Sequence, residues 1–419
     1  MAQPRVGASA QKILLPNGVR VLTEQLEHVD SVSLGLWLDS GVVDDPAGRH
    51  GLTHLIEHMI FKGTRTRSNR RIAETIDDIG GNVNGLTDRE FTYLYARTTA
   101  DHVEQALDLL LDLLLESVCT ARDLAKEKEV VLQEIRLVED TPEDWVHDLL
   151  LEVVWPEHPL GRSVLGSVES VRDIGRASLL QHLRRLRAGR NLVVSAAGRV
   201  THDQVVQCVA RLTASVPPGE PFASPGAPTF TPGRRLVNRP TNQVHLCLAA
   251  PACDRTAPER HVYAVLDTIL GGGTSSRLFH EIREKRGLAY SIGSYLQLYR
   301  TTGIFTVDAG TGPDNFEVVL DLIRKEMARL RRRGPTASEL ERAKTQTRVA
   351  LSLAAESTSF RMQHLAISEL CWGRALPFEE ILAGVTAVTA EDVHALARRI
   401  FASEQQSLVA IGPFGKRRR

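Results

Sequence analysis

The chain carries the same pattern of strands and helices twice, and this repeat limits its fold more than any other feature. In the second half, NQVHLCLAA matches the alternating segment SVSLGLWLD of the first half, and GIFTVDAGTGPDNFEVVLDLIRKEM matches FTYLYARTTADHVEQALDLLLDLL. Further on, Trp372 follows Trp155 by 217 residues, and Val388 follows Val171 by the same number. Two copies of one α/β unit, of about 215 residues each, therefore explain the length of the chain.

The boundary between the two copies is a proline-rich segment. Residues 214–233, ASVPPGEPFASPGAPTFTPG, have neither a helical nor a strand period, as expected of a linker. We therefore predict an N-terminal domain over residues 1–213 and a C-terminal domain over residues 234–419. With 42% hydrophobic and 24% charged residues, the 419-residue chain is globular and too long for a single ordinary core.

Charge and cysteine content argue against several classes of function. The 51 basic residues balance the 51 acidic ones, so net charge gives no indication of binding to nucleic acid or to a membrane surface. No stretch approaches the roughly 18 uninterrupted apolar residues of a membrane span, and residues 1–11 lack the apolar run of a signal peptide. The five cysteines are scattered without a CxxC spacing, which is typical of reduced thiols in a cytoplasmic protein.

The segment GRHGLTHLIEHMIFKGT, residues 48–64, is the strongest candidate for a site of chemistry. Its apolar residues recur at helical spacing, so HLIEH is expected to be helical. Residues four apart lie one above the other on a helix, which brings the imidazoles of His54 and His58 together as a bidentate clamp for a metal ion. Glu57 can reach the edge of the same site, which suits a general base beside a metal-bound water. This is the HxxEH order of the inverted zincins.

Taken alone, the motif leaves a second interpretation open, in which two histidines and a glutamate happen to share an amphipathic helix. An HxxEH string is expected by chance in on the order of one chain in a hundred of this length. A catalytic zinc site needs a third protein ligand, and the presence of that ligand decides between the two interpretations.

A second helix supplies acidic residues near this site. The segment TARDLAKEKEVVLQEIRLVE is predicted to be helical, and Glu127 and Glu134 lie two turns apart on nearly the same face of it. Most acids of so charged a helix are simply solvated, so their spacing alone selects neither one. The second copy has Ala343 and Ala350 at the matching positions and no HxxEH, so only the first copy can bind metal.

Three segments together resemble the pitrilysin family of zinc peptidases, specifically the two-domain branch of mitochondrial processing peptidases and their bacterial homologues. They are HLIEHMIFKGT, EKEVVLQEI and SSRLFHEIREKRGLAYS, and the resemblance extends over nearly the whole chain. The zinc signature of the family has a glutamate 76 residues after the second histidine, and that position here is Glu134. The resemblance thus implies that His54, His58 and Glu134 bind one zinc ion and that Glu57 is the general base.

The same resemblance implies roles for further residues. Glu127 matches an acid that the family uses beside the site, where it can accept a hydrogen bond from a ligand histidine. Asn84 lies where the family presents an edge strand to its peptide, and Gly85 stands where an alanine is usual. Arg283 and Tyr290 have the spacing of a substrate-binding arginine and tyrosine of the second domain, and the tyrosine hydroxyl can also donate to the oxyanion of the reaction.

The implied fold class is α+β. Two homologous domains, each a mostly antiparallel sheet with helices packed on it, are expected to enclose a chamber. The first domain holds zinc, and the second domain, which has no metal ligands, serves substrate binding. The expected function is that of a zinc-dependent endopeptidase that hydrolyses short or unfolded peptides in the cytoplasm, and the expected assembly is a homodimer.

Two alternatives stay open beside this expectation. The chain could be the catalytic subunit of a heteromeric processing peptidase that needs a homologous second chain, although the presence of Glu57, Arg283 and Tyr290 on one chain favours self-sufficiency. It could also be a non-catalytic structural relative. Such a relative need not retain a metal site, whereas all three ligand positions and the base are present here.

Overall fold

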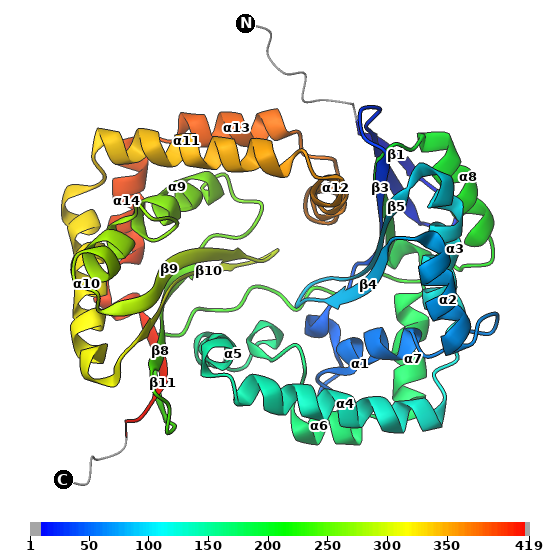
Figure 1. The fold of residues 1–419 in the computed structure, drawn as a ribbon, viewed down its shortest axis with the longest axis horizontal. Helices are drawn as coiled ribbons and strands as arrows, with labels where there is room; N and C mark the ends of the chain where they lie inside the picture. Colours follow the sequence, from blue (N-terminus) through cyan, green and yellow to red (C-terminus); the bar gives the residue numbers. More distant parts are fainter. Residues whose placement is uncertain (1–9, 415–419) are drawn as a thin grey trace, which may run out of the picture. The chain divides into compact units, whose positions relative to one another are not determined.

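The computed structural model describes residues 10–414, which form two compact units (Figure 1). Neither unit is a continuous stretch of the chain. The first unit comprises the residues up to Arg136 together with Ser163–Pro225 and Leu353–Leu376. The second unit comprises Leu137–Arg162, Gly226–Ser352 and the residues from Pro377 onward. Each unit has its own sheet and its own hydrophobic core, as expected of a domain.

The first unit is built on a six-stranded sheet in the order β1-β2-β6-β3-β5-β4. β1 and β2 form an antiparallel hairpin, and β2 and β6 are the one parallel pair of this sheet among the described residues. The central strand β3 is buried on both faces, because helices cover both sides of it. The strands are β1 (Gln11–Leu14), β2 (Arg20–Gln25), β3 (Ser31–Leu38), β4 (Asn82–Thr87), β5 (Thr92–Thr99) and β6 (Leu192–Gly198).

The helices of the first unit form two layers on this sheet. One face packs against α3 and α8 in the main core, and the other face packs against α12. The segment DHVEQALDLLLDLLLESV contains α3, whose apolar residues are buried on several sides of the helix. The helices are α1 (Leu52–Ile60), α2 (Asn69–Ile79), α3 (Val103–Glu116), α4 (Ala121–Glu139), α6 (Val168–Asp173), α7 (Arg176–Leu186), α8 (His202–Leu212) and α12 (Thr358–Trp372).

The second unit is built on a five-stranded sheet in the order β7-β11-β8-β10-β9. Helices α9, α10 and α14 pack on one face in the core, and α5 packs on β8 and β11. The strands are β7 (Arg234–Asn238), β8 (Val244–Ala252), β9 (Ala289–Leu298), β10 (Gly303–Thr311) and β11 (Ser407–Gly412). The helices are α5 (Pro142–Val154), α9 (Arg260–Leu270), α10 (Phe316–Arg333), α11 (Ala337–Ala354), α13 (Phe378–Ala387), α14 (Ala390–Ile400) and a short π-helical segment (Phe279–Glu284).

The two sheets have the same topology, apart from the additional strand β1. The order β2-β6-β3-β5-β4 of the first sheet corresponds to β7-β11-β8-β10-β9 of the second. In both sheets the first pair of this series is parallel and all other pairs are antiparallel. The predicted fold class, α+β with two homologous and mostly antiparallel sheets, is therefore confirmed. The predicted chamber stays a prediction.

The contiguous domain boundaries predicted at residues 213 and 234 need a correction. Residues 216–233 contain no helix or strand, and the chain passes from the first unit to the second within this segment, between Pro225 and Gly226. However, α5 precedes the linker and belongs to the second unit, whereas α12 follows it and belongs to the first. The physical reason is packing, since α5 buries its apolar face on β8 and β11 while α12 buries its own on β3 and β6. A buried ion pair between Arg361 of α12 and Glu24 of β2 also joins α12 to the first sheet.

Two other expectations concern thiols and membrane spans. All five cysteines are free, and Cys119, Cys208 and Cys247 are buried. No helix among residues 10–414 is both long and apolar enough to cross a membrane.

Candidate metal centre

The metal-binding motif lies on α1, as the sequence predicts. The apolar residues of the helix, among them Leu55, Ile56 and Met59, are buried in the main core, and this fixes the direction in which the polar face of α1 points. The helix begins after Gly51, whose φ is +85°. A Cβ at Gly51 would lie 2.4 Å from the carbonyl oxygen of Leu165, so only glycine fits at the start of this helix.

The N-terminus of α1 is capped by a carboxylate from the preceding loop. Asp45 accepts hydrogen bonds from the backbone N–H groups of Gly51, Leu52 and Thr53 at 2.8–3.0 Å, and from the Thr53 hydroxyl at 2.6 Å. An anion at this position satisfies N–H groups that have no partner within the helix and interacts favourably with the helix dipole. Burial raises the pKa of Asp45 to about 7, although these four hydrogen bonds act in the opposite direction.

His182 of α7 completes this buried contact. Its Nε2 lies 3.1 Å from the Thr53 hydroxyl oxygen. Because the single hydroxyl proton of Thr53 is donated to Asp45, Nε2 must be the protonated nitrogen of His182 and must donate to Thr53. Burial lowers the pKa of His182 to about 4, so the imidazole is neutral at physiological pH. The start of the metal-binding helix is thus held by a chain of three buried polar side chains.

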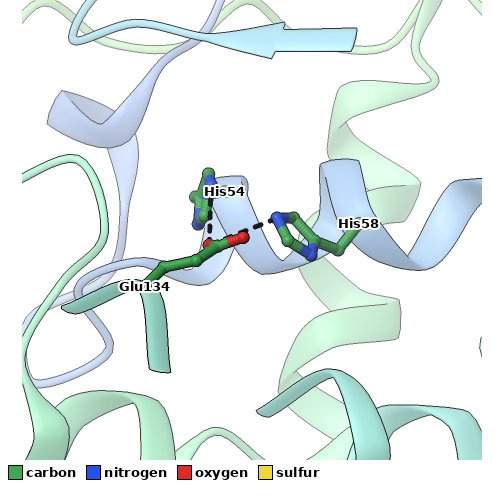
Figure 2. Close-up of side chains that lie close together, drawn as sticks. All are labelled: His54, His58 and Glu134. Carbon is green, nitrogen blue, oxygen red and sulfur yellow. Dashed lines mark ion pairs between the residues drawn. The ribbon is translucent and has the colours of Figure 1, made fainter. Parts of the chain in front are cut away.

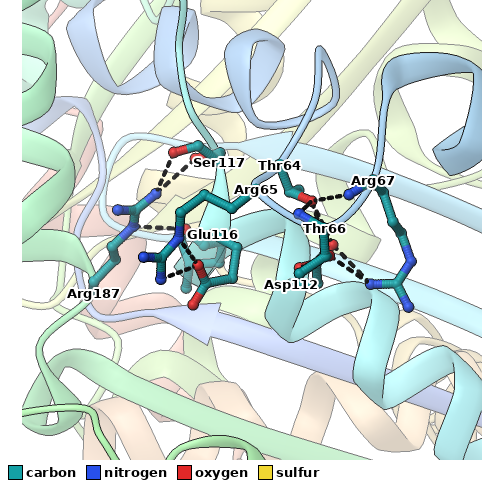
Figure 3. A network of polar contacts seen from close by, with 9 residues as sticks. Thr64, Arg65, Thr66, Arg67, Asp112, Glu116, Ser117 and Arg187 are labelled. Atoms are coloured by element: carbon teal, nitrogen blue, oxygen red, sulfur yellow. Dashed lines mark hydrogen bonds and ion pairs between the residues drawn. The ribbon is translucent and has the colours of Figure 1, made fainter.

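The segment that follows α1 is fixed by a second polar network (Figure 3). The hydroxyl groups of Thr64 and Thr66 donate to the buried carboxylate of Asp112 on α3, at 2.8 and 2.6 Å. Arg67 forms an ion pair with the same carboxylate at 2.8 Å. Arg187 donates to two main-chain carbonyl groups at the C-terminal end of α3. Both ends of α1 are therefore anchored by buried hydrogen bonds.

Three of the predicted site residues converge at the polar face of α1 (Figure 2). His54 and His58 project from successive turns with ring centroids 4.7 Å apart. Glu134 reaches them from α4, with Oε2 3.9 Å from His54 Nε2 and 3.6 Å from His58 Nε2. One potential ligand atom from each residue lies within 4.8 Å of the other two. Among residues 10–414, these three form the one group of three such side chains close enough to hold a metal ion.

The donor set fits a zinc ion. Two imidazole nitrogens and one carboxylate oxygen are a common ligand set of catalytic zinc. Imidazole binds metal in its neutral form, and burial, with a smaller contribution from His58, lowers the pKa of His54 to about 3. Glu134 Oε2 is buried and has no hydrogen-bond partner among the described residues, which is costly unless a cation satisfies it.

Glu127 lies on α4 two turns before Glu134 and is buried beside His58. Its Oε2 lies 3.3 Å from His58 Nδ1, and its Oε1 lies 2.9 Å from the ammonium group of Lys62. A carboxylate at Nδ1 keeps the proton on that nitrogen and leaves Nε2 free to face Glu134. Both acids of α4 thus turn toward α1, in agreement with their predicted common face.

Glu57 lies at the edge of the same group and contacts β4. The hydroxyl of Thr87 donates to Glu57 Oε2 at 3.1 Å. Burial raises the pKa of Glu57, while the Thr87 hydrogen bond and His58 act in the opposite direction. A carboxylate with a raised pKa beside two imidazoles is suited to accept and return a proton.

Two of the three predicted substrate-contact residues, Asn84 and Tyr290, lie on edge strands, and Arg283 lies in the π-helical segment before β9. Asn84 is exposed on β4, which is the edge of the first sheet and pairs only with β5. In the second unit, Tyr290 is 78% exposed on the edge strand β9. The Arg283 guanidinium lies 5.6 Å from the Tyr290 ring centroid and 4.9 Å from that of Phe279. Arg283 and Tyr290 are therefore neighbours, and their action on a substrate stays a prediction.

Sequence reasoning did not identify several residues of this site. Asp45 and His182, which position α1, and Lys62, which pairs with Glu127, carry no spacing signal. The sequence also did not predict Thr87 as a site residue, although it lies three residues after Asn84 in the predicted edge strand. Strand periodicity places Thr87 on the opposite face from Asn84, and that is the only signal that indicated its direction.

Comparisons with known proteins identify the family. The model described as insulinase (peptidase family M16) matches residues 20–168, and the model described as the peptidase M16 inactive domain matches residues 173–347. An uncharacterized zinc protease of Streptomyces coelicolor is 38% identical over 415 residues, which cover 97% of this chain and 90% of that protein. The chain belongs to the M16 family of peptidases.

A further relative and a solved structure are consistent with this family assignment. The uncharacterized zinc protease YmxG of Bacillus subtilis is 36% identical, over 95% of this chain and 97% of its own. The crystal structure of a peptidase M16 inactive domain from Pseudomonas fluorescens has the same fold, with a TM-score of 0.90 and 23% identity over 97% of this chain and 98% of that one. The resemblance to a zinc peptidase family is therefore confirmed, and the inactive-domain model falls mainly on the half without metal ligands.

Proposed function

We propose that the chain is a zinc-dependent endopeptidase that binds one zinc ion and hydrolyses short or unfolded peptides. The observation that carries this proposal is the convergence of His54, His58 and Glu134, with Glu57 beside them on α1 and hydrogen-bonded to β4, a strand that has an open edge. Relatives named zinc proteases, which match almost the full chain, support the choice of metal and of reaction.

His54, His58 and Glu134 would hold the metal, and Glu57 would move the proton. When bound, zinc supplies Lewis-acid chemistry, which activates water and polarises the scissile carbonyl. Glu57 accepts a proton from the attacking water and returns it to the leaving amine, and its raised pKa favours the first of these transfers. Glu127 keeps His58 in the tautomer that presents Nε2, and Lys62 balances the charge of Glu127.

The substrate would bind as an added strand along β4. A peptide that pairs with an edge strand is held mainly by backbone hydrogen bonds, so many sequences are accepted, provided that the peptide is extended. We assign Arg283 and Tyr290 of the second unit to the same substrate, the arginine as a donor to peptide carbonyls and the tyrosine as a donor to the oxyanion. Their closeness to each other and their exposure to solvent support this assignment.

The deciding experiment compares the wild-type protein with Glu57→Gln on a library of quenched fluorogenic peptides. We expect one zinc per chain in both proteins and a loss of at least roughly a hundredfold in kcat in the variant, the lower range for general acid and base catalysis. A chelator should abolish cleavage by the wild type, and added zinc should restore it. A fully active Glu57→Gln protein would contradict the mechanism.

For assembly we propose a self-sufficient homodimer in the cytoplasm. The metal ligands, the base and the Arg283–Tyr290 pair all belong to one chain, and the five free thiols suit a reducing compartment. Light scattering on the purified protein tests the dimer, and peptide cleavage measured on the same sample tests whether the chain is active without a second protein. An inactive sample that gains activity only with a homologous second chain would favour the heteromeric processing peptidase instead.

A further inference from the structure

The inner face of β4 contacts the side chain of Glu57 at two positions. Thr87 donates its hydroxyl proton to Glu57 Oε2 at 3.1 Å, and no other side chain among residues 10–414 donates a hydrogen bond to this carboxylate. Gly85, two residues earlier on the same face, lies under the carboxylate. A Cβ at Gly85 would be 2.7 Å from Oε1, 2.8 Å from Cγ and 3.0 Å from Cδ. The side chain of Glu57 therefore packs directly against the backbone of β4 at Gly85, where there is no side chain.

These contacts fix the orientation of the carboxylate. With Oε2 engaged by Thr87, the lone pairs of Oε1 remain available for a proton from water. A Glu side chain has several rotatable bonds, and without the hydrogen bond its end would sample other rotamers. A general base is effective only within hydrogen-bond reach of the proton that it takes, so loss of orientation lowers the rate of proton transfer.

The strand that makes these contacts is also the strand with the open edge. β4 pairs with β5 on one side only, and its exposed residues Asn82, Asn84 and Leu86 alternate with the inner residues Val83, Gly85 and Thr87. One short segment can thus bind the backbone of a peptide along its edge and hold the base from its inner face. Because both would contact β4, this strand would fix the position of Glu57 relative to the bound peptide.

We propose that Thr87 is a positioning residue of the reaction. It holds Glu57 in the orientation required for proton transfer, and Gly85 provides the space in which the carboxylate lies. This inference rests on the proposed endopeptidase function. It assigns a role in kcat, and not in metal binding or in substrate affinity, because Thr87 contacts neither His54, His58 nor Glu134 through a hydrogen bond.

The test replaces Thr87 with valine, which has nearly the same shape but no hydroxyl. Thr87→Val should lower kcat roughly tenfold or more, the effect of losing one hydrogen bond to a charged group. KM and the zinc content of one per chain should stay at the wild-type values. Thr87→Ser keeps the donor and should restore kcat to within about threefold of wild type. If Thr87→Val fails to fold, Thr87→Ala removes the donor without adding a branched side chain and carries the same expectation.

The matched control is Thr92→Val. Thr92 lies directly opposite Thr87 in β5 and on the same face of the sheet. Its hydroxyl is buried and has no hydrogen-bond partner among the described residues, so its removal should leave kcat and KM unchanged.

The outcomes separate this inference from the function on which it rests. A wild-type protein that cleaves no peptide of the library overturns the proposed function and this inference with it. An active wild type beside a Thr87→Val variant with unchanged kcat overturns this inference alone, and so does a Thr87→Ser variant as slow as Thr87→Val. A loss confined to KM, or a loss of zinc, also contradicts it, because Thr87 would then act on substrate or metal and not on the base.

Discussion

The first α-helix after the central strand differs between the two units at the two positions that carry the candidate metal ligands of the first unit. Counted back from the Gly-Thr pair that follows each helix, His54 of α1 corresponds to Ala264 of α9, and His58 corresponds to Thr268. Alanine has no ligand atom, and the Thr268 hydroxyl donates within its own helix to the carbonyl of Ala264 at 3.0 Å. Two helices on sheets of the same strand order therefore differ in their potential metal ligands through a very small number of side chains.

The acid between these positions is present in both units. Glu57 corresponds to Asp267, and each acid accepts a hydrogen bond from a hydroxyl on the edge strand of its own sheet. Thr87 of β4 donates to Glu57 at 3.1 Å, and Ser294 of β9 donates to Asp267 at 2.5 Å. The link between helix and edge strand thus persists in a unit that has no metal ligands. The link therefore belongs to the scaffold of both units, and in the first unit two histidines stand beside it.

The largest expected effect tests the difference in ligands. His58→Ala should reduce zinc content from one per chain to near zero and reduce peptide hydrolysis to background, because two ligands do not make a stable catalytic zinc site. The control is Thr268→Ala at the corresponding position of α9, which should change neither quantity. Zinc is measured by atomic emission after dialysis, and hydrolysis with a fluorogenic peptide. Loss of zinc in Thr268→Ala would show that the second unit takes part in metal binding.

A smaller effect is expected at the hydrogen bond beside the ligands. Glu127→Gln should weaken zinc binding roughly tenfold to a hundredfold, the usual effect of removing the partner of a ligand histidine. Glu127 accepts from His58 and pairs with Lys62, whereas Glu129 on the same helix is exposed. Glu129→Gln should therefore bind zinc as the wild type does. Competition with a chromogenic chelator measures both affinities, and equal values for the two variants would remove Glu127 from the site.

Periodicity and motif spacing predicted the local structure and the grouping of His54, His58 and Glu134, whose role as metal ligands stays a prediction. The hydrophobic period of HLIEH predicts its helix, and one face of the helix after Thr120 carries both Glu127 and Glu134, as their separation predicts. The family resemblance selected Glu134, because spacing cannot distinguish one acid of a charged helix from another. Sequence periodicity therefore predicted the relative positions of residues that lie within a few turns of one another on a single helix.

Sequence could not predict contacts that depend on tertiary packing. The amphipathic pattern of α5 and α12 shows that each has a face to bury, but not on which sheet, and the contiguous domain boundaries were wrong for that reason. Asp45 precedes the metal-binding helix by one loop, and only the folded path of that loop brings its carboxylate to the helix N-terminus. The same holds for His182, which is distant in sequence.

An effect of intermediate size is expected on stability, where the N-terminus of α1 can be compared with that of α9. Asp45→Ala leaves three backbone N–H groups and the Thr53 hydroxyl without their acceptor, and should lower the free energy of unfolding by about 2 kcal/mol, the upper range for loss of a helix cap. The N-cap residue of α9 is Glu259, and its side chain forms no capping hydrogen bond. Glu259→Ala loses only a half-exposed ion pair with Arg399 and should cost less than about 1 kcal/mol.

The free energy of unfolding that is lost in Asp45→Ala should depend on pH, and the pKa of Asp45 determines the direction. Burial raises the pKa of Asp45 in the folded protein to about 7, from 3.8 in the unfolded chain, so the folded state binds the additional proton between these values. The contribution of Asp45 to stability therefore falls as pH rises from about 4 to about 7. Urea unfolding of chelator-treated protein should show a larger loss for Asp45→Ala at pH 5 than at pH 8. A loss that grows with pH would contradict the raised pKa.

The smallest expected effect concerns the link in the unit without metal ligands. Ser294→Ala removes the donor to Asp267 and should lower the free energy of unfolding by about 1 kcal/mol, the typical net value of a hydrogen bond. Burial raises the pKa of Asp267 to about 6, and the Ser294 hydrogen bond acts in the opposite direction, so its removal raises that pKa further. The ionised carboxylate present above pH 6 depends most on the lost donor, and the loss should therefore be larger at pH 8 than at pH 5, opposite in trend to Asp45→Ala. Zinc content and peptide hydrolysis should equal those of the wild type, because Asp267 has no histidines beside it on α9. If Ser294→Ala lowered kcat as Thr87→Val is expected to do, the two links would share one role in catalysis and the contrast between the units would be wrong.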